Sequence, residues 1–80
     1  MTNKKSNDSK IQAAAALVAE ILGVPKDTVG PDTSMENTPA WDSVEHLNIL
    51  LEFERRFGKI PDLDAIARAT SVREIAELIS

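Results

Sequence analysis

The fold is decided by residues 41–58, WDSVEHLNILLEFERRFG, because this stretch contains the start, body and end of one amphipathic helix. Asp42 can cap the helix, and Glu45 three residues later makes an acidic variant of the capping box. Five residues with helical spacing share one face, and four of them are apolar: Leu47, Leu50, Leu51, Glu54 and Phe57. Gly58 predicts the end of the helix, because glycine readily takes the left-handed conformation that ends helices.

Residues 24–41, which precede this helix, predict a long loop. They show no sustained periodicity, and their breakers are Pro25, Gly30, Pro31 and Pro39. Loops of this length are unusual in so small a domain and are often functional. The apolar residues that could tie the loop to the core are Val24, Val29 and Met35.

The first helix is predicted over about Lys10–Leu22. Its apolar residues have helical spacing, Ser9 can cap its start, and Gly23 can end it. Residues 1–9 contain no apolar residue after the first, so we expect a disordered tail there. Residues 10–80 would then form the single folded domain.

Two shorter helices are predicted after Gly58. Pro61 can open a short third helix over about Asp62–Arg68. Ser71 and Glu74 form a complete Ser-x-x-Glu capping box for a fourth. The apolar residues expected to be buried there are Leu63, Ile66, Val72, Ile75, Ala76 and Ile79. No stretch alternates with period two, so the sequence predicts an all-α four-helix bundle with a long loop between its first two helices.

Acidic residues outnumber basic ones and are concentrated in the middle of the chain. The 80 residues include 13 Asp and Glu against 9 Lys and Arg, which gives a formal net charge of −4. Seven of the acidic residues lie between Asp27 and Glu54, where there is no Lys or Arg. Such a surface repels phosphate backbones, so nucleic-acid binding is disfavoured and a partner with a basic patch is favoured.

Cysteine is absent, which excludes disulfides and thiolate metal sites and fits a reducing compartment. The apolar segment 11–22 is too short to span a bilayer and lacks the flanks of a signal peptide. We therefore expect a monomeric cytoplasmic protein that does not insert into membranes.

Few residues could support catalysis or metal binding. Ser43 and His46 are three apart on one helix, but a nucleophile and base also need an orienting group and an oxyanion site. An exposed helix start offers no cleft for these, so we expect His46 to face solvent. Asp62 and Asp64 lack the glycine-containing loop of a calcium site, and one His without Cys does not support zinc. No catalytic or metal-binding residue is predicted.

Ser43 has the most informative position in the sequence. It lies just inside the start of the longest amphipathic helix and follows the long loop, where another protein's active site could reach its hydroxyl. A phosphate attached there would lie beside free backbone N–H groups and the positive end of the helix dipole. The pattern alone is also typical of an unmodified polar residue in a first helical turn.

The ordered motifs around Ser43 resemble those of the acyl carrier protein family. That family has an Asp-Ser-Leu motif opening its second helix, a Phe near the end of that helix, an Ile-Pro before a short third helix and a Thr-Ser/Thr-Val start to the fourth. The corresponding residues here are Asp42-Ser43-Val44, Phe57, Ile60-Pro61-Asp62 and Thr70-Ser71-Val72. They occur in the same order and at near-correct spacing over residues 10–80.

This resemblance implies a stand-alone carrier, not an enzyme, in which Ser43 holds 4′-phosphopantetheine and Asp42 helps to engage the phosphopantetheinyl transferase. The transferase would use coenzyme A and magnesium, and the thiol of the arm would hold an acyl or aminoacyl group as a thioester. Partner enzymes would bind the second helix through Val44, Glu45, Asn48, Leu51 and Glu52. The core-lining residues of that helix would be Leu47, Leu50, Phe53 and Phe57. Glu20 and Glu77 lie outside this face and are expected to be solvated.

Departures from the family pattern bear on the pathway. Val44 replaces the usual Leu, and Arg55 and Arg56 occupy positions that are commonly acidic in fatty-acid carriers. Trp41 replaces a glycine-containing approach to the helix and is expected to brace the loop against the bundle. These features favour polyketide, nonribosomal peptide, lipid-modifying or D-alanine-transfer systems over bulk fatty-acid biosynthesis.

Two alternatives remain beside the carrier. An unmodified acidic interaction module would dock a basic partner through the loop and second helix, with Ser43 only a neighbour of the cap. Modification of Ser43 by a transferase discriminates between the two. A minimal Ser–His hydrolase would instead turn over esters and lose that activity when His46 is replaced by Ala.

Overall fold

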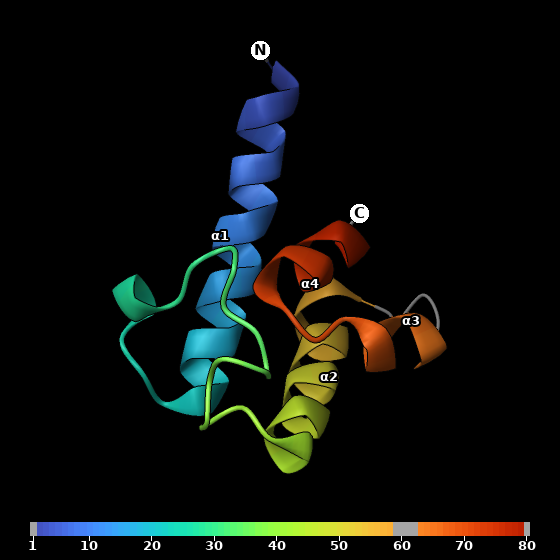
Figure 1. Ribbon diagram of the computed structural model, residues 1–80. Coiled ribbons are helices and arrows are strands. Elements are labelled where there is room, and N and C mark those ends of the chain that lie inside the picture. The colour runs from blue at the N-terminus through green and yellow to red at the C-terminus, as the bar shows by residue number, and fades with distance from the viewer. Residues whose placement is uncertain (1, 59–62, 80) are drawn as a thin grey trace.

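The computed structural model is all-helical (Figure 1). The structure describes residues 2–58 and 63–79. Its elements in chain order are α1 (Thr2–Leu22), the 3₁₀ helix η1 (Lys26–Thr28), α2 (Ser43–Phe57), α3 (Leu63–Arg68) and α4 (Val72–Leu78). No β-strand occurs among the described residues, which confirms the expected all-α class.

Helix α1 begins earlier than the sequence predicts. It begins at Thr2 instead of near Lys10, so Ser9 lies within the helix and is not its cap. Residues 2–9 are helical where the sequence predicts a disordered tail, and in Figure 1 this part of α1 extends past the other elements. No Pro or Gly occurs between Thr2 and Lys10, so the helix can propagate backwards from its packed part.

Glycine ends α1 and α2, as predicted. Gly23 has φ 72° and Gly58 has φ 96°, both in the left-handed region that L side chains rarely adopt. The Gly23 N–H donates to the Ala19 carbonyl and the Gly58 N–H to the Glu54 carbonyl, both at 2.9 Å. The carbonyls of Ala19 and Glu54, in the last turns of α1 and α2, are therefore paired where each helix ends.

The predicted capping box opens α4. The Ser71 hydroxyl oxygen accepts the Glu74 N–H at 3.2 Å, while the Glu74 carboxylate accepts the Thr70 N–H at 3.1 Å. The first bond satisfies a backbone donor at the helix start that has no partner within the helix. The Thr70 N–H precedes the cap and also donates to the Arg68 carbonyl at 2.9 Å. Pro61 lies outside the described residues, and the side chains of Leu63 and Ile66 are not among those described. The roles predicted for these three residues therefore stay predictions.

Residues 23–42, between α1 and α2, are fastened to the start of α4 by backbone hydrogen bonds. An isolated antiparallel β-bridge joins Ser34 to Ser71. Its two bonds, both 2.9 Å long, run from the Met35 N–H to the Thr70 carbonyl and from the Val72 N–H to the Thr33 carbonyl. This segment is therefore held to the body by main-chain bonds as well as by its apolar side chains.

The core lies where α1 packs against α2 and α4. Its buried residues are Ala14, Ala15, Leu17, Val18, Ala19, Val29, Trp41, Ile49, Phe53, Ala69, Val72, Ile75 and Ala76. Val29 is buried, and Val24 and Met35 pack against the same cluster, so these three residues tie the loop to the core as predicted. Small alanines on α1 allow its neighbours to approach closely.

Helix α2 buries a different set of residues from the one that the family resemblance implies. Three of the four expected core residues are buried or half-buried: Leu50, Phe53 and Phe57. The expectation is wrong for Leu47, which is exposed, while Ile49 and His46 are buried. Apolar side chains surround much of α2, so periodicity alone leaves the rotation of this helix open.

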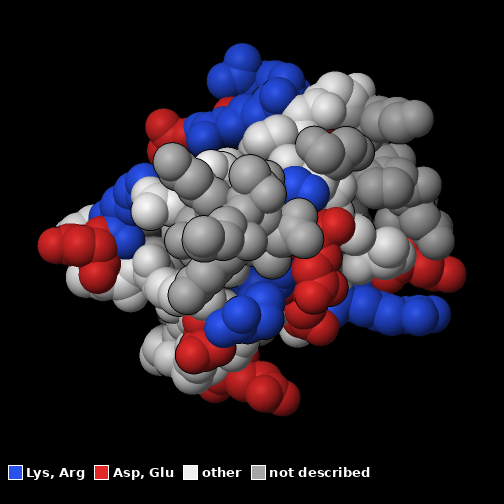
Figure 2. All heavy atoms as spheres, turned by 90° about the horizontal axis from the view of Figure 1, so that it is seen from above, with Lys and Arg blue, Asp and Glu red and all other residues white. Residues whose placement is uncertain are grey.

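Charged side chains of both signs lie next to each other on the face seen from above (Figure 2). One ion pair across the fold joins Arg73 of α4 to Asp32, with 3.1 Å between Arg73 Nη2 and Asp32 Oδ1. Among the coloured atoms of this view no single sign of charge covers the face. No helix in the described part of the chain is long and apolar enough to cross a membrane.

Candidate functional site

The start of α2 builds the site predicted at Ser43. Asp42 has extended backbone, with φ −107° and ψ −173°, and its Oδ1 accepts the Glu45 N–H at 2.9 Å. The Asp42 carbonyl accepts the His46 N–H at 2.8 Å and so closes the first helical turn. Asp42 is thus the N-cap, as predicted, and Ser43 is the first residue of the helix.

Ser43 is exposed at this helix start, which lies at the lower end of the molecule in Figure 1. The first N–H groups of a helix have no acceptor within the helix, and the positive end of the helix dipole lies there. A phosphodiester on the Ser43 oxygen would therefore meet N–H donors and remain open to another protein. The residues at this position fit attachment of a phosphate-linked group.

Trp41 and His46 connect the end of the loop to α2. The Trp41 Nε1–H donates to His46 Nδ1 at 3.1 Å, and the two ring centroids are 5.9 Å apart with an interplanar angle of 34°. Trp41 is 2% exposed and His46 is 7% exposed. The Trp41 backbone N–H also donates to the Thr38 carbonyl at 2.9 Å. Trp41 therefore braces the loop against α2, as predicted.

His46 does not face solvent, so the sequence prediction for this residue is wrong. Trp41 lies one residue before the N-cap and His46 four residues after it, the spacing at which side chains pack across a helix start. Their hydrogen bond gives the buried imidazole a partner and so lowers the cost of burial. This spacing was present in the sequence and was the signal that could have identified the pair.

The same bond bears on the Ser–His alternative. An indole N–H can only donate, so His46 Nδ1 is the acceptor and the proton of the neutral ring is on Nε2. In that tautomer His46 cannot accept the Ser43 proton without losing its bond to Trp41. Ser43 is exposed whereas His46 is buried. The pair therefore lacks the arrangement of nucleophile and base that a hydrolase needs.

Four of the five predicted partner-binding residues lie at the surface of α2 or at its edge. Val44, Asn48 and Leu51 are exposed, and Glu45 is half-buried with its Oε1 accepting from Asn48 Nδ2 at 3.3 Å. In the described part of the chain, the exposed large apolar side chains are Val44, Leu47 and Leu51. Leu47 was missed as a surface residue because it was assigned to the core.

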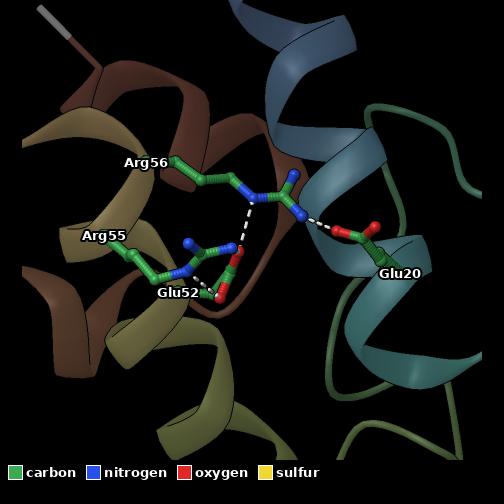
Figure 3. A network of polar contacts seen from close by, with 4 residues as sticks. All are labelled: Glu20, Glu52, Arg55 and Arg56. Carbon is green, nitrogen blue, oxygen red and sulfur yellow. Dashed lines mark hydrogen bonds and ion pairs between the residues drawn. The ribbon is translucent and has the colours of Figure 1, made fainter.

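The fifth, Glu52, is engaged in a network of ion pairs (Figure 3). Its carboxylate accepts from Arg55 Nε and Nη2 at 3.2 and 3.1 Å and from Arg56 Nε at 2.8 Å. The hydrogen bond to Glu52 and its negative charge raise the pKa of the exposed Arg55 guanidinium above its usual value. The Glu52 side chain is 19% exposed, so much of it faces these arginines.

Arg56 extends this network to α1. Its Nη2 contacts the carboxylate of Glu20, so one guanidinium joins α1 to Glu52 of α2. The Glu20 side chain is 65% exposed, in agreement with the expectation that it is solvated, and it also forms this ion pair, which the sequence did not predict. The contact arises because α1 packs against α2 and brings Glu20 opposite the last turn of that helix.

A cavity of about 750 Å³ lies between α1 and the segment around η1. Its lining residues are Ile11, Gln12, Ala15, Lys26, Asp27, Val29, Gly30 and Pro31. None of them belongs to α2, so this cavity is separate from the surroundings of Ser43. No group of three or more His, Asp and Glu residues that could hold a metal ion occurs within residues 2–58 and 63–79.

The geometry describes a small helical domain with an exposed serine at the start of α2. The family model described as phosphopantetheine attachment site matches residues 12–79. The chain therefore belongs to this phosphopantetheine-binding family, in agreement with its resemblance to acyl carrier proteins. It is a carrier protein with an attachment site for 4′-phosphopantetheine, and such domains work with transferases and acyl-handling enzymes without being catalytic themselves.

Proposed function

We propose that Ser43 is the attachment site and that the protein carries acyl or aminoacyl groups as thioesters between partner enzymes. The observation that supports this most directly is the exposed position of Ser43 as the first residue of α2, directly after its cap Asp42. Ser43 also lies within the matched residues 12–79. The order of the helices further supports a four-helix bundle of the acyl-carrier type with a long loop between α1 and α2.

Each residue at the helix start has a chemical role in this proposal. The Ser43 hydroxyl oxygen bonds to phosphorus of coenzyme A, the pyrophosphate bond breaks, the nucleotide part leaves, and the hydroxyl proton passes to the transferase. Asp42 holds the first turn in shape and presents negative charge to the transferase. When bound, the pantetheine arm supplies a terminal thiol, the nucleophile that this cysteine-free chain lacks.

The charge of the chain supports basic partners. The stretch from Asp27 to Glu54 contains seven acidic residues and no Lys or Arg, and it includes most of the loop and most of α2. Loading and transferring enzymes with basic docking patches would therefore be attracted to the side of the protein that holds Ser43. Arg55, Arg56 and Trp41 favour an enzyme set from a specialised pathway over bulk fatty-acid biosynthesis.

The test is an intact mass after incubation with coenzyme A, magnesium and a promiscuous phosphopantetheinyl transferase. We expect a gain of one 4′-phosphopantetheine, abolished in Ser43→Ala and retained in the matched control Ser9→Ala. Far-UV circular dichroism of Ser43→Ala should match the wild type, because Ser43 is exposed and is not the cap. A gain that persists in Ser43→Ala would exclude Ser43 as the attachment site.

One observation favours a second function, an unmodified interaction module. The exposed side chains of Val44, Leu47 and Leu51 could bind a partner without any group on Ser43. No mass gain with two unrelated transferases, on protein shown to be folded, would support this alternative and contradict the carrier assignment of Ser43.

A further inference from the structure

The residues on either side of Ser43 are tied to each other across the start of α2. Trp41 precedes the N-cap Asp42, and His46 is the fourth residue of the helix. A contact between these two positions fixes the angle at which a chain enters a helix. Where such a contact occurs it commonly joins two apolar side chains. Here it also includes a buried hydrogen bond of 3.1 Å from Trp41 Nε1 to His46 Nδ1.

Three more bonds act on the same few residues. The Trp41 N–H donates to the Thr38 carbonyl, the Asp42 carboxylate accepts the Glu45 N–H, and the Asp42 carbonyl accepts the His46 N–H. Helix ends commonly fray, and a first turn held by its cap alone opens readily. Because both neighbours are tied, opening the backbone around Ser43 would break several of these bonds at once, even though the side chain itself is exposed.

We propose that Trp41 and His46 are positioning residues that hold the Ser43 hydroxyl in the orientation in which a phosphopantetheinyl transferase modifies it. This inference rests on the proposed function of Ser43 and goes beyond it, because it assigns a role in the reaction to two buried residues that do not touch the reacting atoms. The Trp41 N–H and the acceptor nitrogen of His46 form one bond, so removing either one should slow the modification.

The primary variant is Trp41→Phe, which keeps an aromatic ring and removes the N–H donor. We expect kcat/KM for modification of Ser43 to fall by about 5- to 30-fold, mainly in kcat, because a reacting group that samples several orientations seldom meets the attacking geometry. Amide hydrogen exchange of Glu45 and His46, whose N–H groups are bonded to Asp42, should become faster. His46→Leu should also lower the rate, and His46→Asn should recover part of it, because its side-chain oxygen lies at the position of Nδ1. The double variant Trp41→Phe/His46→Leu should lose less than the product of the two single losses.

A matched control separates positioning from general loss of stability. Ile75→Val truncates a residue buried in α4, away from the start of α2, and should lower stability with kcat unchanged. All rates are compared on protein shown by circular dichroism to be folded at the assay temperature. If Trp41→Phe does not fold, β-(3-benzothienyl)alanine at position 41 keeps the bicyclic shape and removes only the N–H.

The outcomes distinguish this inference from the function on which it rests. Failure of the transferase to modify the wild-type protein would overturn the assignment of Ser43. Unchanged exchange at Glu45 and His46 in Trp41→Phe would overturn the positioning role without any loading assay. Modification of Trp41→Phe at the wild-type rate, or a loss equal to that of Ile75→Val, would also overturn the positioning role.

Discussion

Leu47 and Ile49 lie two positions apart on α2 and differ in burial, so the same truncation should affect stability very differently. Leu47 is 57% exposed, whereas Ile49 is 1% exposed. Ile49→Ala would leave a void beside α1, since Ile49 belongs to the buried cluster that includes Leu17 and Val18. Leu47→Ala would remove carbons that are already largely in contact with water.

The two burial states set the expected magnitudes. Ile49→Ala should lower the free energy of unfolding by about 2–5 kcal/mol, because the truncation loses transfer free energy and leaves a cavity. Leu47→Ala should change it by no more than about 0.5 kcal/mol, since alanine is the better helix former and little burial is lost. A domain of this length has about 4–12 kcal/mol of stability in all, so the first loss is large.

The assay is urea unfolding followed by far-UV circular dichroism, with Trp41 fluorescence as a second probe of the same transition. If Ile49→Ala is unfolded in buffer, Ile49→Val gives the same comparison with an expected loss of about 0.5–1.5 kcal/mol. A loss for Leu47→Ala as large as that for Ile49→Ala would contradict this difference in burial. It would mean that α2 turns Leu47 into the core, as the family resemblance implied.

Three further perturbations test the helix ends and the link between helices. Asp42→Ala should lower the free energy of unfolding by about 0.5–2 kcal/mol in urea unfolding because the cap is lost; Asp42→Asn should recover most of it, and an equal loss in both would argue against capping. Gly58→Ala places a Cβ at a φ of 96° and should cost about 1 kcal/mol in thermal unfolding, a loss that the control Gly30→Ala, at ordinary φ, should not share. Arg56→Gln breaks the contact with Glu20 and should cost no more than about 1 kcal/mol, shrinking at high salt; a larger, salt-independent loss would point to packing instead.

The boundaries of α2 could be predicted from the sequence because they depend on short-range chemistry. The cap at Asp42 and the stop at Gly58 involve only residues within four positions of each end. The same holds for the capping box of Ser71 and Glu74. Ser43 was therefore placed correctly at a helix start, although its role as the attachment site stays a prediction.

The start of α1 was predicted wrongly because a possible cap at Ser9 was taken as the first boundary of the helix. The sequence places Ser9 where a cap is possible, but a possible cap does not end a helix when the residues before it can also be helical. Disorder was inferred from the lack of apolar residues, which bears on burial and not on the backbone conformation of a helix that continues from a packed segment.

Short-range signals in the sequence were enough to predict the all-α class, the ends of α2, the opening of α4 and the place of Ser43 at a helix start, because caps and glycine stops act within one helical turn. Tertiary structure decided which side of α2 is buried, the contact of Arg56 with Glu20, and the bridge from Ser34 to Ser71. These depend on which segments meet in space. A helix with apolar residues on most sides can bury similar area in several rotations, and its packing against α1 and Trp41 selects one.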